Sequence, residues 1–156
     1  MKNEPLIIIA NKLHYLRIEQ KLKQEDLCLK LNIKRATYAN WESARVEIPL
    51  EKLDLIANFY NIGIDYLFNF YTEKSDIEYK PMNFNKLSEN LKNFKEKNHL
   101  KLESLAIDAG TTVSTIWAYL NDKNKILTTY LYNICQKNNL SADYLLGKVD
   151  NPIYLD

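Results

Sequence analysis

The chain has 156 residues, a formal net charge of +1 and a hydrophobic fraction of 46%. This composition indicates a folded protein rather than a disordered one, and the near-neutral charge argues against a general nucleic-acid coat protein. Because no run of about 18 apolar residues occurs, we expect no membrane span and no signal peptide, and we place the protein in the cytoplasm.

Five short helices are expected in the first half of the chain. Pro5 suits the first turn of a helix, and apolar residues then recur at helical spacing to about Gln20. Further helices are predicted over 24–31, over about 34–43, from Pro49 through Tyr60, and from near Ile64. Asn32 falls where the chain must turn sharply, and asparagine tolerates the left-handed backbone that such a turn needs.

The second half predicts the same plan, with Gly110 at the corresponding turn. Its helices are expected near 86–97, 102–109, 113–121, 126–138 and 142–146. Between the halves, the segment from Asn69 to Asn85 is polar and aromatic, contains Pro81 and has no strong helical period. We therefore expect residues 71–85 to form a linker between a domain at 1–70 and a second domain at 86–156.

A constant displacement relates the two halves without a gap. Leu27 corresponds to Leu105, a displacement of 105 minus 27, or 78 residues. The same displacement pairs Leu13 with Leu91, Leu22 with Leu100, Thr37 with Thr115, Ile48 with Ile126, Leu53 with Leu131, Ile56 with Ile134, and Asp65-Tyr66-Leu67 with Asp143-Tyr144-Leu145. Chance rarely keeps register over so long a stretch, so the sequence predicts one structural unit used twice.

Four motifs of the first half occur together. They are Gln24-Glu25-Asp26-Leu27, Asn32-Ile33-Lys34-Arg35-Ala36-Thr37-Tyr38-Ala39-Asn40-Trp41-Glu42, Pro49-Leu50-Glu51-Lys52-Leu53, and Ile64-Asp65-Tyr66-Leu67. Over about residues 6 to 68 they resemble the Xre/Cro-type, phage-repressor-like helix-turn-helix family. The second half is similar mainly in its apolar skeleton and in its ending, Asp143-Tyr144-Leu145-Leu146-Gly147 followed by Asp150-Asn151-Pro152. The resemblance implies an all-α protein of two tandem five-helix, lambda-repressor-like domains.

In that family the third helix enters the major groove of DNA and presents its first exposed residues to base edges. Carried onto this chain, the base-reading positions are Lys34, Arg35, Ala36 and Asn40. Their chemistry fits: arginine recognises guanine as a fork, asparagine recognises adenine, and a methyl group can touch thymine. Gln24, Thr37 and Ser43 resemble phosphate-contacting positions, and Lys23 and Arg45 would add salt-sensitive attraction. The alternative is that these side chains only keep a surface helix soluble.

Two further positions resemble a structural pair, and the second half lacks the reading residues. Arg17 and Glu42 match family positions that form an ion pair between the first helix and the end of the third. In the second half the positions of Gln24, Lys34, Arg35, Ala36 and Asn40 hold Leu102, Thr112, Val113, Ser114 and Ala118, and those of Arg17 and Glu42 hold Lys95 and Leu120. Trp117 replaces Ala39 at an outward position, where it either forms an interface or is covered by linker residues such as Phe70 or Tyr71.

The sequence predicts a DNA-binding transcriptional regulator, a repressor of bacterial or phage origin. We expect it to act as a homodimer whose contacts involve the second half or the linker, with Trp117 as the leading candidate. The alternative is a protein-interaction module, an inhibitor or adaptor, whose first half only controls its own promoter. A monomer that lays both halves on one duplex is a competing geometry. Because no catalytic set or phosphate-binding glycine loop occurs, we expect no enzyme, and we expect no cofactor. Cys28 and Cys135 have no partners at metal-ligand spacing, so we expect buried free thiols and no metal.

Overall fold

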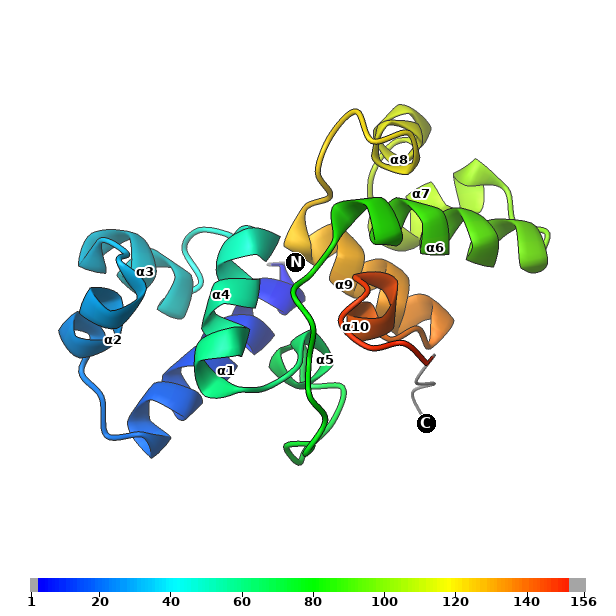
Figure 1. Ribbon diagram of the computed structural model, residues 1–156. Coiled ribbons are helices and arrows are strands. Elements are labelled where there is room, and N and C mark those ends of the chain that lie inside the picture. The colour runs from blue at the N-terminus through cyan, green and yellow to red at the C-terminus, as the bar shows by residue number, and fades with distance from the viewer. Residues whose placement is uncertain (1–2, 152–156) are drawn as a thin grey trace. The chain divides into compact units, whose positions relative to one another are not determined.

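The computed structural model describes residues 3–151. The chain divides into two compact units, and the division lies between Ile77 and Glu78. The described residues form ten α-helices and no strand, so the prediction of an all-α protein is confirmed (Figure 1). Pro152, which belongs to the chain ending that resembles other such domains, lies outside the described residues.

The first unit holds helices α1 (Glu4–Glu19), α2 (Gln24–Leu31), α3 (Arg35–Glu42), α4 (Leu50–Tyr60) and α5 (Ile64–Leu67). Helix α3 packs against α1 and α2, and α5 packs against α1 and α4. Apolar residues recur every three or four positions on these helices, so each helix buries one face. The side chains that form this core include Leu13, Leu16, Leu27, Leu53, Ile56 and Leu67.

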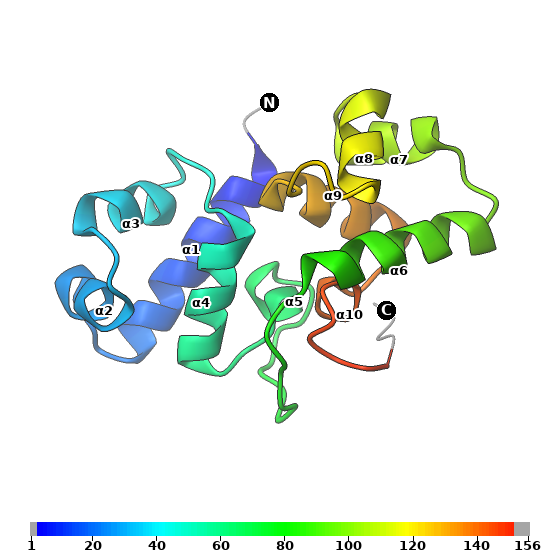
Figure 2. The ribbon, with the colours of Figure 1, turned by 45° about the horizontal axis from the view of Figure 1, so that its top comes forward.

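The second unit holds helices α6 (Phe84–Lys97), α7 (Leu102–Ala109), α8 (Val113–Leu120), α9 (Thr128–Asn138) and α10 (Ala142–Leu145) (Figure 2). Helix α7 packs against α8 and α9, and α10 packs against α6 and α9. Two starts differ from the sequence prediction. Helix α6 begins before residue 86 because the Asn83 side chain accepts hydrogen bonds from the N–H groups of Asn85 and Lys86 at 2.9 and 3.2 Å. Helix α9 begins after residue 126 because Leu127, its N-cap, has an extended backbone, and Ile126 is buried ahead of the helix.

The helices of the two units occupy the same register. The interval of 78 residues from Gln24 to Leu102 carries the bounds of α2, α3, α4 and α5 onto those of α7, α8, α9 and α10. Residues with a positive φ follow the same displacement: Lys21 and His99, Asn32 and Gly110, Ala44 and Asp122, Asn61 and Asn139, Asn69 and Gly147. Because a left-handed residue ends a helix or a turn, the chain changes direction at equivalent points in both units.

The segment that precedes α6 is hydrogen-bonded to the end of the second unit. The N–H groups of Lys80 and Asn83 donate to the carbonyls of Lys148 and Leu146 at 2.9 and 2.8 Å. Lys148 is fully buried, and its ammonium donates back to the carbonyl of Lys80 at 3.2 Å. Part of the segment expected as a linker is therefore paired backbone within the second unit.

The two cysteines, Cys28 and Cys135, are free and buried, which confirms the expectation of buried thiols. Over residues 3–151, no helix combines the length and the apolar character that crossing a bilayer requires. Within the same described stretch, no group of three or more histidine, cysteine, aspartate or glutamate side chains is placed to hold a metal ion.

Candidate nucleic-acid interface

Helices α2 and α3 are joined by a tight turn at residues 32–34. The N–H of Lys23 donates to the Asp26 carboxylate at 3.0 Å at the start of α2. At its end, Asn32 adopts φ +54° and ψ +48°, which confirms the expected left-handed turn residue. Helix α3 then starts at Arg35, directly after Lys34. This turn sets the angle between the two helices and fixes which face of α3 remains in solvent.

Buried aromatic side chains hold α3 in place from its inner face. Tyr38 is fully buried and Trp41 nearly so, and their rings meet edge to face with centroids 6.3 Å apart. Leu27 and Cys28 of α2 are buried as well. Since 100° separates successive residues of a helix, burying positions 38 and 41 turns positions 35, 36 and 40 away from the core.

The four candidate base-reading residues lie at the start and on the outer side of α3. Lys34, Arg35 and Ala36 are exposed, and Asn40 is half-buried. Within residues 3–151, neither Lys34 nor Arg35 forms an ion pair. Their hydrogen-bond donors are therefore available to a ligand that approaches the N-terminal half of α3.

The candidate phosphate-contacting residues lie on both sides of that helix. Lys23, Thr37, Ser43 and Arg45 are exposed, and Gln24, the first residue of α2, is half-buried. The Ser43 hydroxyl donates to the carbonyl of Asn40 at 3.3 Å, and the N–H of Arg45 donates to the same carbonyl at 3.0 Å. The backbone after α3 thus folds back onto the helix and keeps Ser43 and Arg45 near its C-terminal end.

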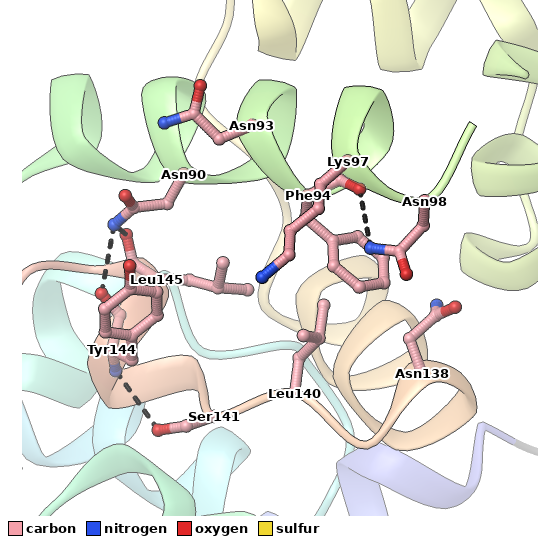
Figure 3. Close-up of a pocket in the computed structure, with 10 residues that line it drawn as sticks. All are labelled: Asn90, Asn93, Phe94, Lys97, Asn98, Asn138, Leu140, Ser141, Tyr144 and Leu145. Atoms are coloured by element: carbon pink, nitrogen blue, oxygen red, sulfur yellow. Dashed lines mark hydrogen bonds between the residues drawn. The ribbon is translucent and has the colours of Figure 1, made fainter. Parts of the chain in front are cut away.

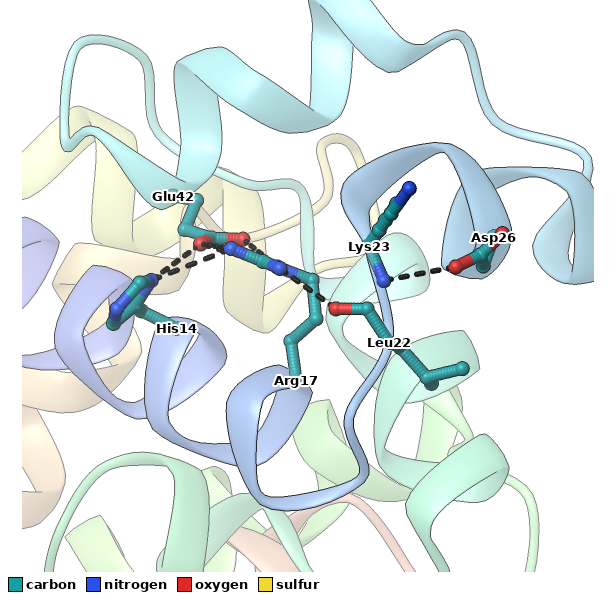
Figure 4. Close-up of polar contacts among 6 residues, drawn as sticks. All are labelled: His14, Arg17, Leu22, Lys23, Asp26 and Glu42. Atoms are coloured by element: carbon teal, nitrogen blue, oxygen red, sulfur yellow. Dashed lines mark hydrogen bonds and ion pairs between the residues drawn. The ribbon is translucent and has the colours of Figure 1, made fainter.

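The side chains of Arg17 and Glu42 form an ion pair between α1 and the end of α3 (Figure 4). The guanidinium of Arg17 donates to the two carboxylate oxygens at 2.7 Å from Nη2 and 3.0 Å from Nε. Its remaining nitrogen, Nη1, donates to the carbonyl of Leu22 at 2.7 Å. Both side chains are largely buried, with exposed fractions of 11% and 6%. This arrangement uses the Arg17 side chain to position α3 and leaves none of its three nitrogens directed only at solvent.

His14 joins this pair, a role that the sequence prediction missed. Its Nδ1 lies 2.7 Å from a carboxylate oxygen of Glu42 and 3.4 Å from Nη2 of Arg17. The available signal was the three-residue spacing of His14 and Arg17, which places both on one face of α1. Burial opposes ionisation of Glu42, but the hydrogen bonds from Arg17 and His14 outweigh it and lower the pKa of Glu42 to about 2.

The second unit presents a different surface at the equivalent positions. The Thr112 hydroxyl accepts the N–H of Thr115 at 3.2 Å and so caps α8, and Ser114 lies 3.2 Å from the same hydroxyl. Trp117 and Val113 are 49% and 37% exposed. Ile107 of α7 and Leu127, before α9, are also exposed, at 78% and 45%. We call Ile107, Val113, Trp117 and Leu127 the apolar surface of the second unit.

Comparisons with known proteins point to the same part of the chain. A helix-turn-helix family model, HTH_3, matches residues 13–67, from the middle of α1 to the end of α5. The chain is also similar to the uncharacterized HTH-type transcriptional regulator YobD of Bacillus subtilis (strain 168), with 31% identity over 88 residues. That alignment covers 56% of this chain and 71% of the relative. No solved structure matches the chain significantly.

Proposed function

The chain belongs to the helix-turn-helix family of transcriptional regulators, and from this premise we propose that it represses transcription by binding operator DNA with α3. In this proposal the bases of the major groove are read by Lys34, Arg35, Ala36 and Asn40. The protein and its operator DNA would both lie in the cytoplasm. The observation that carries the proposal is the exposed Arg35 directly after the turn, which forms no ion pair within residues 3–151 and lies on a helix whose other face is buried.

The surrounding polar residues support the same docking. Lys23 and Gln24 at the start of α2, and Thr37, Ser43 and Arg45 around α3, would contact the phosphates that flank the groove. Phosphate contacts set the register of a protein on DNA without reading its sequence, so these residues supply affinity and salt dependence. Glu42 is the one acidic side chain of α3, and its ion pair with Arg17 offsets a charge that would repel phosphate.

We propose that the second unit is a degenerate copy of the first and does not read DNA. The shared helix bounds and the five pairs of positive-φ residues support the common origin. The side chains at the equivalent positions support the loss of base reading, because none of Thr112, Val113, Ser114 and Ala118 is a long hydrogen-bond donor. On this view the chain comprises a DNA-binding domain at 1–70, a connecting segment at 71–85 and an interaction domain at 86–156.

One reading helix contacts few base pairs, so a second must come from another copy of the chain. Two-fold related helix-turn-helix units place their reading helices one DNA turn apart, about 34 Å, and bind near-palindromic sites. We propose that the apolar surface of the second unit forms the homodimer contact, with Trp117 as its central residue. Exposed tryptophan is characteristic of interfaces, because its large ring gains most from being covered.

A second candidate function is favoured by the same surface. Trp117 could dock a different protein, in which case the second unit is the active part of an inhibitor or adaptor and the first unit controls only its own promoter. The self-association of the purified chain distinguishes the two, because a surface built for another protein leaves the chain monomeric.

Selection of DNA sites from a random duplex library, with the full chain, tests the DNA-reading proposal. The test variant carries the residues of the second unit at the reading positions: Lys34→Thr, Arg35→Val, Ala36→Ser and Asn40→Ala. A matched control changes Ser114→Ala, at an exposed position of α8 outside the apolar surface. We expect the wild type and the control to enrich one near-palindromic sequence and the test variant to enrich none. Enrichment of the same sequence by the test variant would contradict the assignment of α3.

A further inference from the structure

A pocket of about 360 Å³ lies in the second unit between α6 and the chain that leads into α10 (Figure 3). Its apolar lining includes Phe94, Leu140 and Leu145, and the ring of Tyr144 closes one side. Asn90, Asn93, Asn98 and Asn138 supply amide groups, and Lys97 supplies the one charged side chain of the lining. The lining therefore combines apolar and aromatic side chains with several polar groups, and the volume is at the lower end of the range of small-molecule sites.

The equivalent positions of the first unit carry larger side chains. Positions 90, 93 and 138 of the second unit correspond to Lys12, Tyr15 and Tyr60 at the displacement of 78 residues. The ammonium of Lys12 lies 4.1 Å from the centre of the Tyr66 ring and covers it. Tyr66 is the counterpart of Tyr144, so in the first unit a lysine occupies the space beside this ring.

Two of the three asparagines of the second unit are engaged in hydrogen bonds to the protein. Asn90 donates through Nδ2 to the carbonyls of Tyr144 and Leu145 at 3.1 and 3.2 Å. Asn138 donates to the carbonyl of Ile134 at 2.9 Å and to the Asp108 carboxylate at 3.0 Å. Replacing three long side chains by three short ones, two of which bond elsewhere, leaves the face of Tyr144 open.

The charge at the edge of the pocket is also reversed between the units. Lys97 corresponds to Glu19, which forms an ion pair with Lys74 in the first unit. Lys97, by contrast, forms no ion pair within residues 3–151, and its side chain extends from α6 into the pocket (Figure 3). With no acidic residue in the lining, the pocket favours a ligand that carries a negative charge.

We propose that this pocket binds a small aromatic carboxylate or a similar flat monoanion. The flat apolar body would lie between Phe94 and Tyr144, above the two leucines, where aromatic contacts are most favourable. The carboxylate would pair with the ammonium of Lys97 and accept hydrogen bonds from the amide of Asn93. One lysine matches one negative charge, which favours a monoanion over a phosphate ester.

Phenylacetate is the probe that tests this proposal, with acetate and 2-phenylethanol as its charge-only and ring-only counterparts. The readout is the side-chain amide signals of the ¹⁵N-labelled full chain, titrated without DNA. We expect the amides of Asn90, Asn93 and Asn138 to shift with phenylacetate, with a Kd on the order of 1 mM or tighter for so small a molecule. Acetate and 2-phenylethanol should bind at least about tenfold more weakly.

Three variants make the result specific. Lys97→Met should weaken phenylacetate binding about tenfold or more, whereas Lys92→Met, which changes an exposed lysine of the same helix, should leave it unchanged. Asn93→Tyr restores the residue of the first unit and should abolish binding by filling the pocket. The melting temperature of each variant should equal that of the wild type, because positions 92, 93 and 97 are exposed. Unshifted pocket amides, equal binding of the three probes, or full binding by Lys97→Met would each overturn the proposal.

Discussion

The guanidinium of Arg17 contacts both oxygens of the Glu42 carboxylate while it donates to the carbonyl of Leu22, so one side chain joins α1, the loop before α2 and the end of α3. The pair lies under the helix that carries Arg35 and Asn40. The pair therefore helps to fix the orientation of α3. Loss of Glu42 should lower the free energy of unfolding rather than remove a contact with DNA.

Glu42→Ala should destabilise the protein in the absence of DNA. The change leaves a largely buried guanidinium without its carboxylate, which costs about 2 to 4 kcal/mol for a pair of this burial. The melting temperature followed by circular dichroism should fall by roughly 10 °C or more. Glu73→Ala is the matched control, since Glu73 is exposed and forms no ion pair within residues 3–151. Identical melting curves for Glu42→Ala and the wild type would show that the Arg17–Glu42 pair does not stabilise the fold.

The contribution of Glu42 should also depend on pH. The pKa of Glu42 falls from 4.5 to about 2 on folding, so the carboxylate contributes stability above about pH 4.5 and loses it as the pH falls toward 2. Glutamine does not titrate, so the difference in unfolding free energy between the wild type and Glu42→Gln should shrink between about pH 6 and about pH 3. Urea denaturation at each pH measures this difference. A constant difference across that range would show that Glu42 titrates normally in the folded protein.

Arg35→Ala should relax base preference. If the guanidinium reads a guanine, its loss costs about 1 to 3 kcal/mol on the selected operator and much less on random duplexes. Fluorescence anisotropy with both duplexes measures the two affinities. Lys23→Ala serves as the contrast, since a phosphate contact should weaken binding to both duplexes alike and reduce its salt dependence. Equal losses on both duplexes for Arg35→Ala would assign Arg35 to phosphate.

Trp117→Ala should dissociate the proposed homodimer. Removing a central interface tryptophan costs about 2 kcal/mol or more, which raises the dimer Kd roughly 30-fold. Sedimentation velocity over a range of concentrations reports the change. Leu29→Ala removes an exposed apolar side chain of the first unit and should leave the dimer intact. If the wild type is a monomer and still binds a two-part site with full affinity, the second unit must itself contact the DNA.

The sequence predicted those features that depend on local pattern. The bounds of α2 and the left-handed Asn32 followed from apolar spacing and turn chemistry, which operate within a few residues. The starts of α6 and α9 differ from the prediction. The side chain of Asn83 caps α6, and Ile126 is buried ahead of α9. A lysine is normally read as a surface residue, so the fully buried Lys148 gave no signal.

The candidate site was predictable to the extent that a familiar motif carries it. The exposure of Arg35 and the contact of Arg17 with Glu42 match the expected arrangement, whereas the contact of His14 with Glu42 was missed although its spacing of three residues from Arg17 places both on one face of α1. The pocket beside Tyr144 had no signature in the sequence. The pocket exists because three short asparagine side chains do not fill the space between segments that are distant in the chain. Residue spacing within one segment cannot predict such a space.

Because the two units share one register, a deletion of one repeat length would keep the remaining helices in the same order and at the same spacing. A recombination event that removed residues 24–101 would join Lys23 to Leu102 and delete 78 positions, one full repeat. Every later helix boundary and left-handed residue would keep its place relative to α1. Such a chimera would combine the first helix of the first unit with the last four helices of the second, at the same spacing along the chain.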